Sequence, residues 1–171
     1  MQDFLFKTIV DGTYMVIWYD GDEETVEIPD TYYGMPVRVI GDGVFKNKTW
    51  VKHVVIPENV MELGGFVFDG CENIETVSLP ESLISIWQYA FVRSGFRELV
   101  IPERVKNIIP FTFSECRKLE RVTLLHEDVK IFSNAFRDCE NLRELIVRGT
   151  PSIDPNAFSG SAATPLIRVI E

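Results

Sequence analysis

The chain has few of the side chains from which most active sites are built. Its 171 residues include only two histidines and three cysteines. A nucleophile and its base must lie within hydrogen-bonding distance, and we do not expect His53 or His126 to lie near a cysteine. A glycine-rich loop of the kind that binds phosphate is also missing. We therefore expect no enzymatic activity and no cofactor.

Basic residues are in the minority. The 17 lysines and arginines are outnumbered by 26 aspartates and glutamates, so the net charge is −9. Bulk electrostatics therefore argues against nucleic acid or an anionic membrane as a partner. No apolar run approaches the roughly 20 residues that cross a bilayer, so we expect no membrane insertion.

Residues 1–7 lack the basic lead and the apolar length of a signal peptide. The expectation is a cytoplasmic chain. The alternative is a domain cut from a longer exported protein.

Phenylalanine, in contrast, recurs at a nearly constant interval. Six of these residues are separated by 23, 23, 22, 23 and 22 positions, and each has Ile or Leu five positions before it. Self-similarity at roughly 20 to 29 residues is typical of a leucine-rich-repeat solenoid, whose coils bury their apolar faces against one another. We therefore predict a column of stacked rings: Phe45, Phe68, Phe91, Phe113, Phe136 and Phe158.

Each repeat also contains a strand pattern. In residues 121–124, apolar Val122 and Leu124 alternate with polar residues, which indicates a strand with one buried face. Stacked copies predict one continuous parallel sheet on the concave face, ended in several units by a proline. The Ala-Phe segment predicts short helical or 3₁₀ turns on the convex side, preceded by a short second strand. The predicted fold class is therefore α/β.

The two ends differ from the middle. Residues 4–19 predict a β-hairpin with a two-residue turn at Asp11 and Gly12. We expect residues 1–27 to form an N-terminal hairpin cap and residues 28–171 a solenoid of about six units. Five extra residues in the first coil predict a bulging loop at 31–36. The last strand has no cap after it, which predicts either truncation or self-association at that edge.

The cysteines follow the repeat. Cys71, Cys116 and Cys139 each lie three residues after a repeat phenylalanine, where Ser94 and Ser161 stand in other units. We expect a column of small inward-facing side chains, with the thiols in a structural role. A single column does not supply the converging ligands of a metal site.

Several units share a more specific pattern. Residues 74–80 (IETVSLP), 56–60 (IPENV), 40–45 (IGDGVF) and 134–139 (NAFRDC) match parts of LxxIxIPxxVxxIGxxAFxxC. Residues 8–171 therefore resemble the BspA-like leucine-rich repeat family. The resemblance implies a bacterial surface protein that adheres to host matrix or to other cells. It implies no catalytic residues, because the family shares none.

Two surfaces are candidates for binding. On the sheet, neighbouring units alternate in charge, as in Arg97, Glu120 and Arg143. This column is either a self-paired, solvated face or a polar docking strip. On the convex side, apolar residues replace the glycines of the first units. We call them the aromatic ridge, and they are either a partner surface or part of the core: Phe66, Trp87, Tyr89, Ile109, Phe111 and Phe132.

A third aromatic group lies near the start of the chain. We expect it to pack the cap against the first coil, with a ligand-facing patch as the alternative. Its members are Tyr14, Trp18, Tyr19, Tyr32 and Tyr33.

Two hypotheses for function follow. The first is a non-catalytic protein-interaction module with a protein partner of unknown identity, an adhesin or recognition fragment as the resemblance implies. The second is a structural spacer or intracellular scaffold that self-associates through its C-terminal strand.

Overall fold

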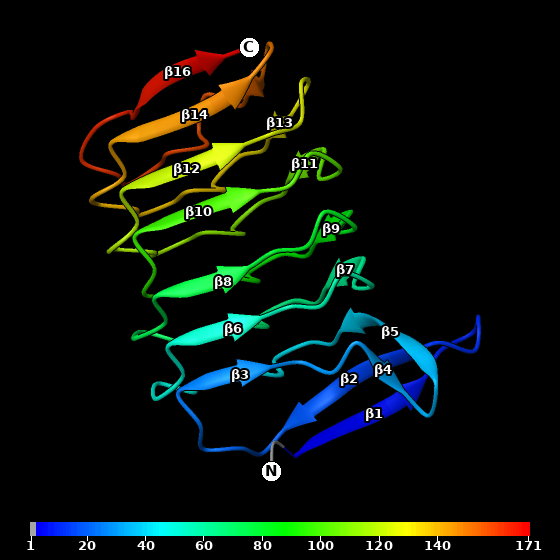
Figure 1. The fold of residues 1–171 in the computed structure, drawn as a ribbon. Helices are drawn as coiled ribbons and strands as arrows, with labels where there is room; N and C mark the ends of the chain where they lie inside the picture. Colours follow the sequence, from blue (N-terminus) through cyan, green and yellow to red (C-terminus); the bar gives the residue numbers. More distant parts are fainter. Residues whose placement is uncertain (1–2) are drawn as a thin grey trace.

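The structure is a computed structural model that describes residues 3–171. It is a parallel β-solenoid of about seven coils (Figure 1). Each coil contributes one strand to a main sheet, and its chain then passes through a short second strand and a turn. The main-sheet strands are β3 (Thr25–Glu27), β6 (His53–Val55), β8 (Thr76–Ser78), β10 (Glu98–Ile101), β12 (Arg121–Leu124), β14 (Glu144–Arg148) and β16 (Leu166–Ile170).

The expected short second strand is present in successive coils. These strands pair in parallel, and each ends on the Ile or Leu five residues before a repeat phenylalanine. They are β5 (Met35–Ile40), β7 (Glu62–Leu63), β9 (Ser85–Ile86), β11 (Asn107–Ile108), β13 (Lys130–Ile131) and β15 (Ser152–Ile153).

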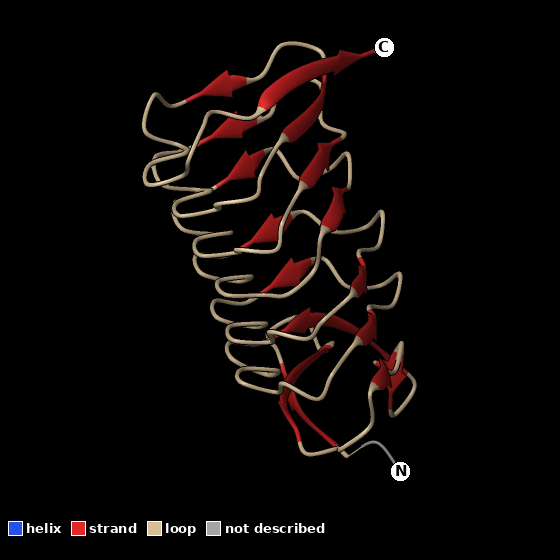
Figure 2. Ribbon diagram, turned by 90° about the vertical axis from the view of Figure 1, so that its left-hand side faces the viewer, coloured by secondary structure: helices blue, strands red, loops and turns tan. Residues whose placement is uncertain are grey.

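The expectation of helical or 3₁₀ turns is wrong. Residues 3–171 contain strands, turns and loops but no helix (Figure 2). In the turn segments every second backbone N–H donates to a carbonyl of the next coil instead of to its own turn. In the first coil these donors are Gly43, Phe45 and Asn47, at 3.0, 2.9 and 2.7 Å. An α-helix needs those same donors for its own i−4 carbonyls.

The backbone conformation also prevents a helix. Around Phe91, for example, the residues two positions before and two positions after it, Tyr89 and Arg93, have positive φ angles of 62° and 56°. The same pair of positions is left-handed around Phe45, Phe68, Phe113 and Phe136. Left-handed residues do not propagate a right-handed helix.

The predicted column of rings is confirmed. Successive phenylalanine rings from Phe45 to Phe158 lie 5.0–5.6 Å apart between centroids, and their planes are within 20° of parallel. Tyr19 of the N-terminal hairpin closes the lower end, 5.3 Å from the ring of Phe45. The column therefore runs through the middle of the solenoid and holds successive coils together.

The cysteines are free and buried, as expected for structural thiols. Each thiol donates to the carbonyl of the column phenylalanine in the preceding coil, as Cys116 does to Phe91 at 2.9 Å. Ser94 makes the equivalent bond to Phe68, also at 2.9 Å. Either cysteine or serine can occupy this position, because both are small donors that satisfy a buried carbonyl.

The main sheet is not continuous, contrary to expectation. β3, β6 and β8 form one sheet, while β10, β12, β14 and β16 form another. The short strands are interrupted at the same level, between β9 and β11. Figure 1 shows the wider spacing between β8 and β10. Backbone hydrogen bonds across this level remain in the turn segments, for example Phe91 N to Thr112 O at 3.0 Å, and between Gly95 N and Cys71 O, also at 3.0 Å.

A one-residue deletion coincides with the interruption. The buried Phe96 follows Phe91 by five residues, whereas Ile74 follows Phe68 by six. The shortened segment passes very close to the coil below, because a Cβ placed on Gly95 would lie 2.0 Å from the carbonyl oxygen of Glu72. The strand that follows, β10, does not pair with β8.

The N-terminal hairpin consists of β1 (Phe4–Thr8) and β2 (Tyr14–Tyr19), and β2 pairs in parallel with β5. Its turn has three residues instead of two: Ile9 bonds to Thr13, and Gly12 between them has a φ of 82°. This is a type I turn followed by a left-handed glycine.

Aromatic and cation–π contacts also join the hairpin to the first coil. The ring of Phe6 stacks on Tyr32 at 4.2 Å. Lys48 places its ammonium 5.1–5.6 Å from the ring centroids of Trp18, Tyr19 and Trp50. The loop expected at 31–36 is a second hairpin, in which β4 (Thr31–Tyr32) pairs with β5. Tyr14, Tyr19 and Tyr32 thus pack the hairpin onto the coil, as expected, whereas Tyr33 is largely exposed.

The ring column predicts a large difference between central and terminal positions. Phe91→Ala removes a ring that is stacked on both sides and fully buried, and should lower the free energy of unfolding by about 3–5 kcal/mol. Phe158→Ala, at a half-buried position stacked on one side, should cost clearly less. Urea unfolding followed by circular dichroism measures both. Equal losses of unfolding free energy would contradict a column whose central rings contribute more than its terminal ring.

The buried thiols predict a loss of stability at alkaline pH. Burial raises the pKa of the Cys71 and Cys139 thiols to about 12, from an ordinary value of 9.0. Their stabilising contribution is therefore complete below pH 9 and is lost as the pH rises toward 12. The free energy of unfolding should fall by about 1.4 kcal/mol per pH unit for each thiol in this window. A double serine variant, Cys71→Ser with Cys139→Ser, should show a shallower slope in reducing buffer, and the same slope in both proteins would contradict the assignment.

Candidate functional site

The main sheet neutralises part of its own charge through ion pairs between neighbouring strands. Arg121 lies between Glu98 at 2.8 Å and Glu144 at 2.6 Å, and its hydrogen bond lowers the pKa of the Glu144 carboxyl. Among the ion pairs of residues 3–171, none joins Glu75 to Arg97, because the sheet is interrupted between their strands.

The aromatic ridge is partly exposed. Trp87, Phe132 and Phe66 have exposed fractions of 50%, 42% and 39%. The other members, Tyr89, Ile109 and Phe111, are half-buried. Ridge side chains lie where the short strands pass into the turns, away from the ring column of the core.

Three ridge residues form a stack of their own. The ring of Tyr89 lies 4.7 Å from Phe66 and 5.1 Å from Phe111, and each pair of planes is 6° from parallel. All three residues have left-handed backbones, with φ angles of 57–64°. The equivalent positions in flanking coils are Gly43 and Asn134, which are the residue types that tolerate this conformation.

These aromatic residues therefore occupy positions where a bulky side chain is conformationally unfavourable. A left-handed backbone costs a residue with a Cβ roughly 1–2 kcal/mol. Stacking returns about 0.5–1.5 kcal/mol for each ring pair. With three strained residues and two ring pairs, stacking offsets only part of the strain, and the result is an aromatic stack at the surface.

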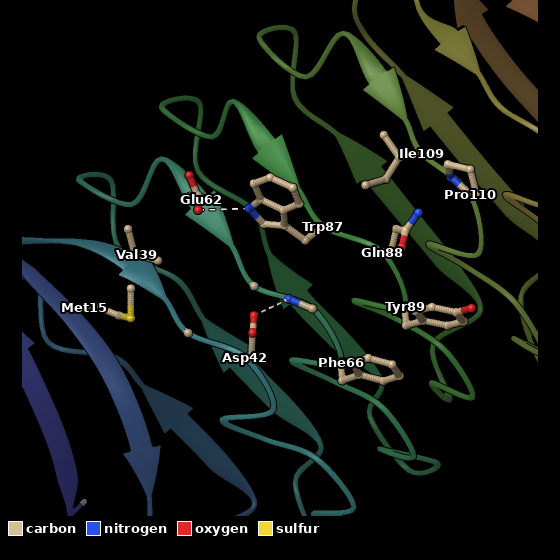
Figure 3. Close-up of a pocket in the computed structure, with 13 residues that line it drawn as sticks. Met15, Val39, Asp42, Glu62, Phe66, Trp87, Gln88, Tyr89, Ile109 and Pro110 are labelled. Atoms are coloured by element: carbon tan, nitrogen blue, oxygen red, sulfur yellow. Dashed lines mark hydrogen bonds between the residues drawn. The ribbon is translucent and has the colours of Figure 1, made fainter. Parts of the chain in front are cut away.

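A groove of about 740 Å³ lies beside this stack (Figure 3). Its depth comes from glycine: a Cβ on Gly64 would lie 2.6 Å from the backbone of Gly41, so these two coils come close together and no side chain fills the space. In Figure 3, Met15 and Val39 line one end and Ile109 and Pro110 the other.

The polar groups of the groove are acidic or neutral. Asp42 accepts a hydrogen bond from the backbone N–H of Gly65 at 2.7 Å. Glu62 accepts one from the indole N–H of Trp87 at 2.9 Å, which fixes the orientation of that ring (Figure 3). Each bond uses one oxygen of the carboxylate. The described lining contains no lysine, arginine or histidine.

The groove contains four of the six ridge residues that were candidates from the sequence: Phe66, Trp87, Tyr89 and Ile109. Phe111 and Phe132 lie outside it. Asp42 and Glu62 were not predicted as site residues, because in the sequence they look like ordinary surface acids. The paired glycines at 64 and 65, beside a tryptophan in the next unit, were the signal that a hollow forms there.

Other kinds of site find no support in the part of the chain that is described. Nowhere in residues 3–171 do three or more His, Cys, Asp or Glu side chains gather as metal ligands would. The same residues include no helix long and apolar enough to cross a bilayer. His53 lies on β6 and pairs with Thr76 at 2.9 Å.

The family assignment follows from the repeats. Six copies of the BspA type Leucine rich repeat region match residues 38–164. The chain belongs to the BspA-type leucine-rich repeat family. The resemblance seen in the sequence is thereby confirmed.

Solved structures of leucine-rich repeat proteins share the fold. A leucine-rich repeat protein of T. pallidum, TpLRR, is 29% identical with a TM-score of 0.80, over 84% of this chain and 68% of that one. One from Bacteroides capillosus is also 29% identical, with a TM-score of 0.64, over 71% of this chain and 93% of its own.

The pneumococcal vaccine antigen PcpA is similar in fold alone, at 21% identity and a TM-score of 0.70. The match covers 95% of this chain and 42% of PcpA. Among curated proteins, none matches the chain significantly.

The left-handed positions predict an unusual order of stability for the Gly and Ala variants. At Tyr89, the Gly variant should be more stable than the Ala variant by about 1 kcal/mol, because alanine cannot relieve the positive φ. The neighbouring Gln88, exposed and without a positive φ, is the matched control and should show the opposite order. Thermal unfolding of the four variants measures this, and the same order at both positions would contradict the strain.

Proposed function

We propose that this chain is a non-catalytic protein-binding module of a recognition or adhesion type. Its docking surface is the aromatic ridge together with the groove beside it. Membership of a repeat family and likeness to other repeat proteins support a module whose stacked coils present one extended surface.

The main support for this proposal is the backbone conformation of three ridge residues. Phe66, Tyr89 and Phe111 occupy left-handed positions where neighbouring coils use glycine or asparagine. Strained backbone that persists in a structure is concentrated at functional sites. Packing does not require these rings, because the core column is complete without them. Exposed aromatic residues are also favoured as the residues that dominate binding energy.

The main sheet supports the same assignment by contrast. Several of its charged side chains are already paired within the protein. A partner docking there would have to replace these pairs, whereas the ridge offers apolar surface whose burial is favourable.

A peptide-display selection tests the proposal. Peptides selected on the native protein should lose at least tenfold in affinity for the Trp87→Ser and Phe132→Ser variants, since a dominant aromatic contact is worth about 2 kcal/mol or more. Both side chains are substantially exposed, so each variant should stay within about 1 kcal/mol of the parent stability.

Val100→Ser is the matched control, because Val100 is 53% exposed on the main sheet. It should leave peptide affinity unchanged. Loss of binding through Val100 instead would place the docking face on the main sheet. Selection of no binder to the ridge would leave the array as a structural spacer.

A further inference from the structure

The groove beside the ridge is negatively charged as well as apolar. Its lining combines aromatic and aliphatic side chains with the carboxylates of Asp42 and Glu62. Each carboxylate uses one oxygen for an internal hydrogen bond, to Gly65 or to Trp87. Within residues 3–171 the other oxygen, Asp42 Oδ2 or Glu62 Oε2, has no hydrogen-bond or ion-pair partner, and no basic side chain of the lining offsets the charge.

The ring of Trp87 is held in place at this acidic site. Its indole N–H is committed to Glu62, and half of the side chain is exposed. A tryptophan face is the best aromatic surface for a cation, and a carboxylate beside it adds a charge-assisted hydrogen bond. Figure 3 shows the two carboxylates and the Trp87 ring between the apolar ends of the groove.

The protein itself contains this combination a short distance along the same surface. The ammonium of Lys46 lies 5.0 Å from the ring centroid of Phe66, at the end of the ridge stack. The same ammonium lies 3.2 Å from the buried carboxylate of Asp69. An aromatic ring and a carboxylate thus already hold one basic side chain at the edge of the ridge.

We infer that the groove binds a basic side chain of the partner protein, an arginine flanked by apolar residues in an extended segment. This inference rests on the proposed function and names the chemistry of its partner. Arginine fits better than lysine because its planar guanidinium stacks on an indole while it hydrogen-bonds to carboxylates. The flanking apolar residues would cover Met15 and Val39 at one end and Ile109 and Pro110 at the other. Asp42 and Glu62 are the residues that determine specificity.

Three blocked pentapeptides test this inference: Ala-Leu-Arg-Leu-Ala, its counterpart with citrulline, and its counterpart with glutamate. Citrulline keeps the shape of arginine without the charge. Binding is followed by the indole N–H resonance of Trp87 in the ¹⁵N-labelled protein, one of three tryptophans, assigned with Trp87→Phe. The arginine peptide should shift this resonance and bind about tenfold more tightly than the citrulline peptide. The glutamate peptide should not bind.

Two isosteric variants test whether the carboxylates of Asp42 and Glu62 attract the arginine side chain. Asp42→Asn and Glu62→Gln each keep the oxygen that accepts the internal hydrogen bond, so the groove retains its shape. Each should weaken the arginine peptide about threefold to fivefold and leave the citrulline peptide unchanged. Glu58→Gln, at an exposed carboxylate outside the groove, should change neither. Raising the salt to 0.5 M should reduce the advantage of arginine.

The outcomes separate the two proposals. Equal binding of the arginine and citrulline peptides would overturn the basic partner while leaving the groove a docking site. Binding that survives both charge-removing variants would do the same. If none of the three peptides shifts the Trp87 resonance, the groove does not take an extended segment, and the inference fails whatever the display selection shows for the rest of the ridge.

Discussion

Stacking of one phenylalanine from each coil is the interaction on which this structure depends. The rings lie 5.0–5.6 Å apart, close to the spacing of about 4.8 Å between neighbouring strands, so the column and the sheets fit the same rise per coil. Each ring is buried only when a neighbouring coil is present. The Cys or Ser three residues later then satisfies the phenylalanine carbonyl of the coil below, which links hydrophobic packing to backbone hydrogen bonding in one repeated unit.

Much of this architecture could be predicted from the sequence because it depends on spacing. The interval of 22 or 23 residues places the rings in a column, and the alternation at Val122 and Leu124 places a strand. The turns could not be assigned in the same way. Ala and Phe suit a helix as well as a turn, and only the inter-coil bonds of residues such as Phe45 decide between them. The sheet interruption coincides with a single deletion near Gly95, where the chain passes close to the carbonyl of Glu72, and a spacing of one residue does not by itself predict the loss of pairing.

The candidate site was predictable in part for a similar reason. Trp87 and Tyr89 stood out because glycine or asparagine fills their positions in other units. The carboxylates of Asp42 and Glu62 did not, because acidic residues are common on this surface and their role depends on which atoms face the groove. The left-handed backbone of Phe66, Tyr89 and Phe111 could not be predicted from the sequence either, since bulky aromatic residues normally argue against this conformation.

The interruption between β8 and β10 has a mechanical consequence. In a linear array, stability is the sum of each unit and its junctions with its two neighbours. The junction at this level lacks both ladders of strand pairing and is held by ring packing and turn bonds. Of the coil junctions in residues 25–171, it is the one without paired strands, so we expect it to be the weakest junction of the array. Tension along the long axis would part the coils there first and leave a hairpin-capped block and a C-terminal block, each still folded around its own share of the rings.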